Sequence, residues 1–215
     1  MSFGFFPDMG GGGGTVVRRQ LITADATWTR PAGMLGDTVW ITGIGGGGSG
    51  NINANTATRR GGSSGEFCVQ RPVNIGAAES VSVTVGAGGA ALIANGSAQN
   101  TGNNGSPSSF GAFLTLSGGF GAGATPTFPV NMGGNISGNA SPIAGNFGAP
   151  CANDGQPFGG SGLLLDTSGT SGGQATGGTP GWGYGGGGAG SSQLTQDSGA
   201  GAPGAWLVEW LEALE

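Results

Sequence analysis

The glycines that follow the strand-like run Val-Trp-Ile-Thr (residues 39–42) have the most recognisable chemical spacing in the chain. Residues 43–48, Gly-Ile-Gly-Gly-Gly-Gly, satisfy the G-x-G-x-x-G pattern of dinucleotide-binding loops. That chemistry requires a helix that begins on the glycines, because the helix N-terminus faces the pyrophosphate. Residues 49–62 read S-G-N-I-N-A-N-T-A-T-R-R-G-G, which predicts no helix, and a chain without Lys has no Walker loop. The sequence therefore predicts no nucleotide site.

Side chains for acid–base or metal chemistry are sparse. The chain contains no His, so the most frequent general base and zinc ligand is missing. The carboxylates are scattered, and no spacing among them indicates the pair that glycoside hydrolysis requires. Asp154 and Asp166 stand near Asn and Ser but lack the Asp-x-Asp spacing of calcium loops. We therefore predict a protein that is not an enzyme and that needs no cofactor or metal.

Charge and cysteine content narrow the classes further. The formal net charge is -5, and the six basic residues, all Arg, form no basic stripe that would neutralise phosphates. We therefore expect no nucleic-acid partner. Cys68 and Cys151 are too few for a disulfide scaffold or a four-cysteine zinc site. Two small buried side chains and a single disulfide bridge both agree with this content.

The N-terminal segment differs from the rest of the chain. Phe3, Phe5 and Phe6 precede a run of glycines, and nothing here resembles the basic and apolar regions of a signal peptide. No apolar run in the chain approaches the ~18 residues that a membrane span needs. A frayed terminus and an aromatic peg on a flexible tether are both consistent with the segment. We assign residues 1–17 as an attachment arm anchored by the three phenylalanines, and residues 18–215 as a glycine-rich β domain.

Stretches of β-forming residues separated by turn signals predict an all-β domain. The alternation of Val with Ser or Thr over residues 79–85 predicts a strand with one buried and one exposed face. Residues 38–44 carry apolar side chains on both faces, which is typical of a strand covered on both sides. Further strands are predicted over residues 20–30, 66–75 (with Pro72 marking an edge or a bulge), 109–116 and 205–210. Helix-forming residues occur only near the C-terminus, where a short helical turn is expected.

Glycine accounts for 53 of the 215 residues and is concentrated between the predicted strands, over residues 45–65, 118–162 and 169–204. Ordinary connections are about 4–6 residues long, so these stretches need order of their own in a compact domain. Glycine can form extended left-handed helices of the polyproline II type while keeping its N–H group, so that neighbouring helices bond to each other. A packed array of polyglycine II helices and flexible loops are the two open interpretations.

Aromatic residues within the glycine-rich stretches are the candidate binding groups. Gly, Asn, Ser and Pro surround them. In one interpretation they fill gaps beneath the loops. In the other they form a recognition surface, as Tyr and Trp do beside Ser, Gly and Asn in antigen-binding loops. The candidate receptor-binding residues are Phe128, Phe147, Phe158, Trp182 and Tyr184.

A series of motifs resembles, in order, the glycine-rich domain of bacteriophage tail fibres. The resemblance covers roughly residues 22–210, and the order of the motifs makes it more specific than any one of them. The motifs are T-W-T-R-P-A-G at residues 27–33, T-V-W-I-T-G-I-G-G-G-G-S-G at 38–50, V-S-V-T-V-G-A-G-G-A at 81–90, N-G-S-P-S-S-F-G-A at 104–112, G-Y-G-G-G-G-A-G at 183–190 and G-A-P-G-A-W-L-V-E-W at 201–210.

This resemblance implies a virion protein at a fibre tip, attached to other tail or baseplate proteins and exposed to the host cell surface. The expected partner on the host is a surface glycan or an outer-membrane protein, and the expected assembly is a homotrimer. The expected fold is an antiparallel β-sandwich, jelly-roll-like, with long glycine-rich loops or polyglycine II helices. Two alternative functions stay open. One is a decoration, collar or baseplate protein that binds no receptor, and the other is an enzyme that acts on host polysaccharide.

Overall fold

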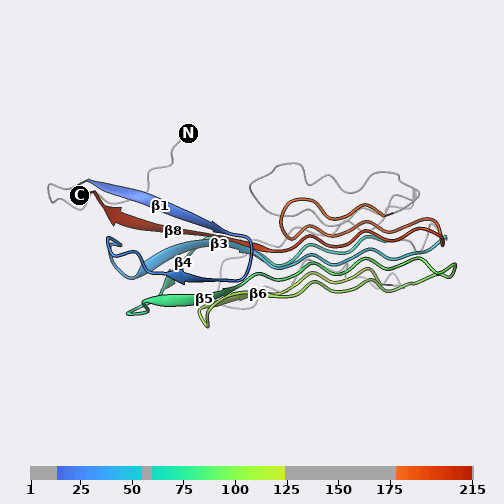
Figure 1. Ribbon diagram of the computed structural model, residues 1–215, viewed down its shortest axis with the longest axis horizontal. Helices are drawn as coiled ribbons and strands as arrows, with labels where there is room; N and C mark the ends of the chain where they lie inside the picture. The colour runs from blue at the N-terminus through green and yellow to red at the C-terminus, as the bar shows by residue number, and fades with distance from the viewer. Residues whose placement is uncertain (1–13, 55–59, 124–177, 215) are drawn as a thin grey trace.

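The computed structural model describes residues 14–54, 60–123 and 178–214 (Figure 1). The strands form two antiparallel sheets, with strand orders β1-β8-β3-β4 and β2-β5-β6-β7. The described residues contain no helix, and so none with the length and hydrophobicity to traverse a bilayer. The predicted all-β, sandwich-like class is therefore confirmed. The strands are β1 (Thr15–Ile22), β2 (Ala26–Thr29), β3 (Thr38–Ile44), β4 (Phe67–Asn74), β5 (Ser80–Thr84), β6 (Ser108–Phe110), β7 (Leu114–Leu116) and β8 (Ala205–Ala213).

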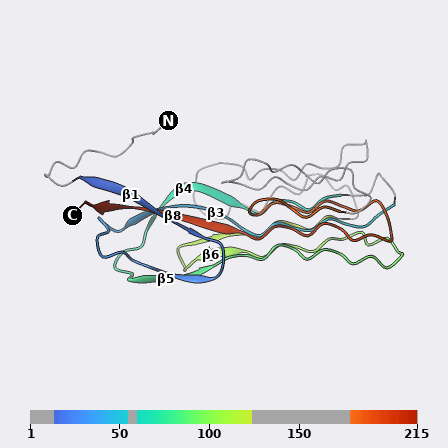
Figure 2. The same cartoon turned by 45° about the horizontal axis from the view of Figure 1, so that its top comes forward.

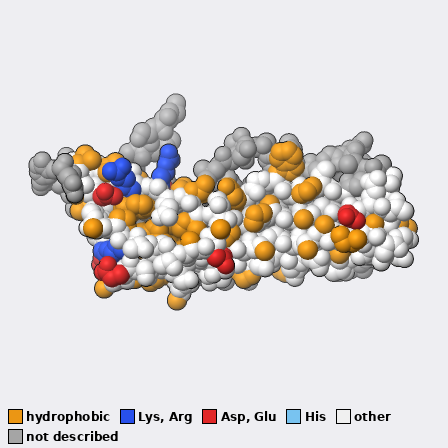
Figure 3. Space-filling model, viewed as in Figure 1, with side chains coloured by type: hydrophobic (Ala, Val, Ile, Leu, Met, Phe, Trp, Pro, Cys, Tyr) orange, Lys and Arg blue, Asp and Glu red, His pale blue; other side chains and the backbone are white. Residues whose placement is uncertain are grey.

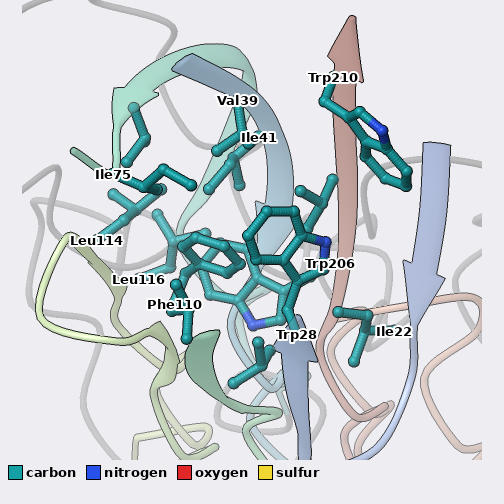
Figure 4. Packing of buried hydrophobic residues seen from close by; sticks show 14 of the residues in the cluster. Ile22, Trp28, Val39, Ile41, Ile75, Phe110, Leu114, Leu116, Trp206 and Trp210 are labelled. Carbon is teal, nitrogen blue, oxygen red and sulfur yellow. The ribbon is translucent and has the colours of Figure 1, made fainter. Parts of the chain in front are cut away.

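The two sheets pack around an aromatic core (Figure 4). Trp28 on β2 and Phe110 on β6 come from one sheet and Trp206 on β8 from the other, and all three side chains are fully buried. The ring centroids of Trp28 and Phe110 lie 5.9 Å apart, and those of Phe110 and Trp206 lie 6.4 Å apart. These separations are typical of favourable aromatic pairs. The Trp206 indole donates a 3.0 Å hydrogen bond to the carbonyl of Thr84, so β8 is also tied to β5 of the opposite sheet.

Several predicted strands are confirmed. β3 begins and ends at the predicted residues. β5 buries Val81 and Val83 on one face, as its alternation predicts, and β8 likewise buries Trp206 and Val208. Pro72 lies in β4, which is an edge strand of its sheet, as predicted.

The prediction of one strand over residues 20–30 is wrong. β1 ends at Ile22, and β2 begins at Ala26 in the opposite sheet. Between them, the Asp25 side chain accepts a 2.8 Å hydrogen bond from the backbone N–H of Val85, which holds the crossing between the sheets. β1 itself begins at Thr15, so the last residues of the predicted attachment arm pair with β8.

Two other local predictions also fail. Residues 109–116 form the hairpin of β6 and β7 rather than one strand, because Gly111 adopts a φ of 52° and reverses the chain. The expected helical turn at the C-terminus is absent, since β8 continues to Ala213. Pairing with the whole length of β1 there outweighs the helix propensity of the sequence Glu-Trp-Leu-Glu-Ala.

The glycine-rich segments leave one end of the sandwich and run side by side as extended rods, as Figures 1 and 2 both show. Charged side chains gather mainly over the sandwich, whereas the visible face of the rods carries few of them (Figure 3). A bundle with so little charge and so few bulky side chains must be held by its backbone. The rods comprise residues 45–53, 60–66, 85–94, 99–107, 117–123, 178–181, 185–191 and 198–204.

Candidate functional site

Residues 45–53 are here called the central rod, and residues 45–52 of it donate their backbone N–H groups to three neighbouring rods in rotation. Residues 60–66, 99–107 and 198–204 accept in turn, and the same acceptor rod returns after three residues. Three residues per turn is the repeat of the polyproline II helix, which polyglycine also adopts. The donor–acceptor pairs are Gly45–Glu66, Gly46–Ser106, Gly47–Ala202, Gly48–Ser63, Ser49–Asn103 and Gly50–Gly199, with N···O distances of 2.9–3.0 Å.

Three other rods donate to the carbonyl groups of the central rod. They are residues 85–94, 117–123 and 185–191, so the central rod is enclosed on all sides by hydrogen-bonded neighbours. The interpretation of the glycine-rich stretches as a packed array is therefore confirmed for the described residues. The pairs are Gly119–Gly46, Gly89–Gly47, Gly188–Gly48 and Ala122–Ser49, with N···O distances of 2.7–2.9 Å.

At Gly46, Gly47 and Gly48, the spacing between the rods leaves no room for a side chain. A Cβ atom on Gly46, Gly47 or Gly48 would lie 2.1 Å from the nearest carbonyl oxygen of a neighbouring rod. No described glycine of the central rod has a positive φ, so the missing Cβ is what makes glycine necessary here. The backbone N–H groups of the G-x-G-x-x-G motif are bonded to neighbouring carbonyls, which leaves them no freedom to hold a phosphate.

Buried polar side chains occur where the rods meet the sandwich. The Glu66 carboxylate is 2% exposed and accepts a 2.8 Å hydrogen bond from the backbone N–H of Ser117. The Ser108 hydroxyl donates to the carbonyl of Ile44 and accepts from the N–H of Gly86, both at 2.9 Å. These contacts connect one rod or strand to another, which is a structural role. No group of His, Cys, Asp and Glu able to hold a metal ion occurs among the residues that the structure describes.

Cys68 lies half-buried in β4, and its thiol is 3.5 Å from the carbonyl oxygen of Ile41. Burial raises the pKa of the Cys68 thiol to about 11. A thiol with a raised pKa is a weak nucleophile near neutral pH, because the thiolate is the reactive form. Cys68 therefore behaves as a small packed side chain, and Cys151 lies outside the described residues.

The rods end, away from the sandwich, in the distal turns, which we define as residues 92–98, including the last three residues of rod 85–94, and residues 192–197. They lie at the end of the array away from the sandwich, because rod 85–94 leaves the sandwich after β5 and rod 198–204 returns to it before β8 (Figure 1). The two turns are bonded to each other: the N–H of Ala94 donates to the Asp197 carboxylate at 2.8 Å, and the N–H of Gly96 donates to the carbonyl of Leu194 at 2.9 Å. The array thus holds a surface at its far end in a defined arrangement.

The exposed side chains of the distal turns are of mixed character. Ile93 is 68% exposed, and its carbonyl accepts a 2.6 Å hydrogen bond from the Gln99 side chain. Behind the turns, the side chains of Asn53 and Asn100 hydrogen-bond to each other, and Ile52 is fully buried between rods. Apolar and amide groups side by side on a fixed backbone can contact either a sugar or a protein surface.

Of the predicted receptor-binding residues, Trp182 and Tyr184 lie together on the turn between rods 178–181 and 185–191. Trp182 is 57% exposed and Tyr184 is half-buried. This turn is at the sandwich end of the array, since the N–H of Gly185 donates to the carbonyl of Pro203 near the start of β8. The other predicted residues lie outside the described residues, namely Phe128, Phe147 and Phe158 of the receptor-binding set and Phe3, Phe5 and Phe6 of the attachment arm.

The sequence did not lead us to the distal turns, although a signal is present. Residues 95–97 read Asn-Gly-Ser, and Gly96 has a φ of 79°, as a tight turn requires. Residues 191–198 carry a weaker signal, since they contain Ser and Asp but no Gly or Pro. Aromatic content favoured other segments, while the distal turns use Ile, Leu, Gln and Asp.

A small β-sandwich that carries a hydrogen-bonded array of polyglycine helices defines the structural class of this protein. Residues 22–211 match the family model described as a glycine-rich domain, and the chain belongs to this family. A search of curated proteins found no match.

Proposed function

We propose that this protein is a non-enzymatic adhesin, the receptor-binding tip of a bacteriophage tail fibre. The observation that carries the proposal is the array itself, whose backbone groups bond to each other while its far end presents side chains on fixed turns. Binding sites are commonly built on surface turns that a rigid scaffold positions. The motifs in residues 22–210 that resemble tail-fibre domains also support this proposal.

Two surfaces are available for the receptor. The distal turns present Ile93, Leu194 and neighbouring amide groups, and the turn at the sandwich end presents Trp182 and Tyr184. A glycan receptor would stack on an exposed indole, whereas an outer-membrane protein would need the larger mixed surface of the distal turns. We favour the distal turns, because their distance from the sandwich leaves the sandwich free to attach to other tail or baseplate proteins.

The remaining expectations belong to the same proposal. The protein would act on the virion as a homotrimer, without a cofactor, facing the host cell surface. The alternative is a structural protein of the virion that binds no receptor. Its support is the exposed Trp182 beside the sandwich, since an exposed aromatic near the attached end would serve contacts between virion subunits.

Labelling of bacteria with the fluorescently tagged protein tests the proposal. We expect the folded protein to label some strains of a bacterial panel and Ile93→Asp to lose most of that labelling with an unchanged melting temperature. A loss with Trp182→Ala instead would move the binding surface to the sandwich end. Labelling of no strain beyond the level of heat-unfolded protein would contradict the adhesin and favour the structural alternative.

A further inference from the structure

The edges of the two sheets differ in how they are protected. The edge strand β4 contains Pro72 and a residue with a positive φ, Gln70, and the edge strands β2 and β7 have only four and three residues. Pro, irregular backbone and short length are common protections of a sheet edge. β1 has none of them: its eight residues, T-V-V-R-R-Q-L-I, are regular and pair with β8 without a register shift. Among the residues that the structure describes, β1 is thus a long edge strand, on which another strand can add.

The hydrogen-bond pattern identifies the backbone groups that point outward from β1. In an antiparallel pair, alternate residues direct their N–H and C=O groups toward the partner strand. Leu214 donates to the carbonyl of Gly14, whereas Ala213 donates away from β1, to the carbonyl of Gly33. Even-numbered residues of β1 therefore face β8. The outward groups belong to Thr15, Val17, Arg19 and Leu21.

The side chains beside this edge specify what can pair with it. Val17 and Leu21 are 41% and 46% exposed on either side of Arg19. On its inner edge, β1 pairs with β8, a mainly apolar strand with two acidic residues. Arg19 stands opposite Glu209, and the Arg18 guanidinium lies 3.6 Å from the Glu212 carboxylate. A strand of the same character would suit the outer edge.

A second copy of β1 is a poor occupant of this edge. Antiparallel pairing of β1 with itself over seven or eight residues requires a centre at Arg18, at Arg19 or between them. Each of these registers places Arg directly opposite Arg, and like charges opposite each other destabilise a strand pair. Registers that avoid this contact leave at least two residues of the strand unpaired.

We propose that the outer edge of β1 is an attachment site that adds one extended segment of a different virion protein as a further strand. The segment pairs with the outward groups of Val17, Arg19 and Leu21, and it carries acidic residues opposite the arginines and apolar residues beside Val17 and Leu21. Strand addition of this kind draws affinity from main-chain bonds and specificity from alternate side chains. That the partner belongs to a virion rests on the proposed function, whereas the strand addition itself does not.

A synthetic peptide with the sequence of Ala205–Ala213 serves as the probe, because this sequence already pairs with β1 on its inner edge. Amide hydrogen exchange is measured on the full chain. We expect the amides of Val17, Arg19 and Leu21 to exchange rapidly in the free protein and at least tenfold more slowly in excess peptide. A control peptide with both glutamates replaced by Lys should give no such protection.

Val17→Pro tests the main-chain contact, since it removes one outward N–H while leaving the pairing with β8 in place. We expect at least tenfold weaker peptide binding and an unchanged melting temperature, with Val17→Thr binding as wild type does. Equal binding by Val17→Pro, no protection by the peptide, or protection of these amides in the free monomer would overturn the proposal. Self-association that protects the same amides would identify a second copy as the occupant and would also overturn it. Cell labelling plays no part in these measurements, so the adhesin and the attachment site can fail separately.

Discussion

Replacing Gly48 by Ala places one methyl group at the most enclosed part of the array. The added Cβ would lie 2.1 Å from the carbonyl oxygen of Phe120, and ordinary contact begins at 3.4 Å. The three nearest atoms are all backbone atoms of Phe120 and Gly121, so no flexible side chain can turn away. Rod 117–123 would have to move by about 1.3 Å, which is the difference between these two distances.

A displacement of that size breaks the hydrogen bonds of the displaced rod. The N–H of Ala122 donates to the carbonyl of Ser49, and the N–H of Ser63 donates to the carbonyl of Phe120, both at 2.9 Å. Lengthening either by more than 1 Å takes it outside hydrogen-bonding distance. Each of these two buried hydrogen bonds costs about 1–3 kcal/mol when it is lost. Gly48→Ala should therefore lower the free energy of unfolding by about 2–6 kcal/mol, a large part of the ~5–15 kcal/mol of a typical domain.

Two measurements should be made, because the array and the sandwich could unfold separately. Urea unfolding followed by circular dichroism gives the loss of stability of the whole chain. Amide hydrogen exchange at Ser63 and Ala122 reports on the array itself, and we expect faster exchange there in the variant. Tryptophan fluorescence alone would be insufficient, since Trp28, Trp206 and Trp210 belong to the sandwich core.

Gly123→Ala is the matched control. A Cβ on Gly123 meets nothing within 4 Å, and its φ is not in the left-handed region. The substitution should be neutral, or stabilising by up to ~1 kcal/mol through the loss of unfolded-state freedom. If Gly48→Ala and Gly123→Ala have the same midpoint and the same exchange rates as wild type, glycine is not required by the packing of the rods and the account above is wrong.

Two further predictions concern the sandwich. Arg30 donates to the carbonyls of Gly76 and Gly36 and to the Asp37 carboxylate at 2.7–2.9 Å, so Arg30→Ala should cost about 1–3 kcal/mol in urea unfolding, while Arg19→Ala should stay within ~0.5 kcal/mol. A cost for Arg30→Ala no larger than that of Arg19→Ala would contradict this role. The pKa of the Cys68 thiol in the folded protein lies above the ordinary value of 9.0. The contribution of the protonated thiol to the free energy of unfolding is therefore fully present below pH 9 and is lost as the pH rises toward about 11. In a Cys151→Ser background, iodoacetamide should therefore modify folded protein slowly at pH 8 and unfolded protein quickly; equal rates would show that the thiol is accessible.

Alternation and burial predicted the sandwich well where one strand face is buried. β5 and β8 were found from Val81, Val83, Trp206 and Val208, which all point into the core. The prediction failed where the chain reverses without Pro or a Gly pair, as between β1 and β2. There a single side chain, Asp25, holds the crossing by a contact with a residue far along the chain. Contacts of that kind have no local pattern in the sequence.

The candidate site was predicted less well, for a related reason. In a polyglycine rod, the face on which a side chain points depends on which neighbours surround that rod, and the neighbours come from distant parts of the sequence. Ile52 is fully buried while Ile93 is largely exposed, although both stand in similar Asn- and Ala-rich surroundings. The composition of the sequence therefore predicted a binding surface in the glycine-rich segments, but it did not identify the distal turns as that surface.

The glycine pattern nevertheless carries positional information once the array is understood. A rod has three side-chain directions, so a rod with one packed direction needs glycine at every third residue, as rod 99–107 has at Gly102 and Gly105. Both of these glycines face the central rod, where a Cβ would meet the carbonyl oxygens of Ser49 and Gly46. Where neighbouring backbones close all three directions, consecutive glycines are needed, as at Gly45 to Gly48 of the central rod, where each added Cβ would lie 2.1–2.2 Å from a carbonyl oxygen of a neighbouring segment. Consecutive glycines therefore mark a segment closed in all directions, whereas a spacing of three, as in rod 99–107, leaves the side chains between the glycines exposed, such as those of Asn103 and Asn104.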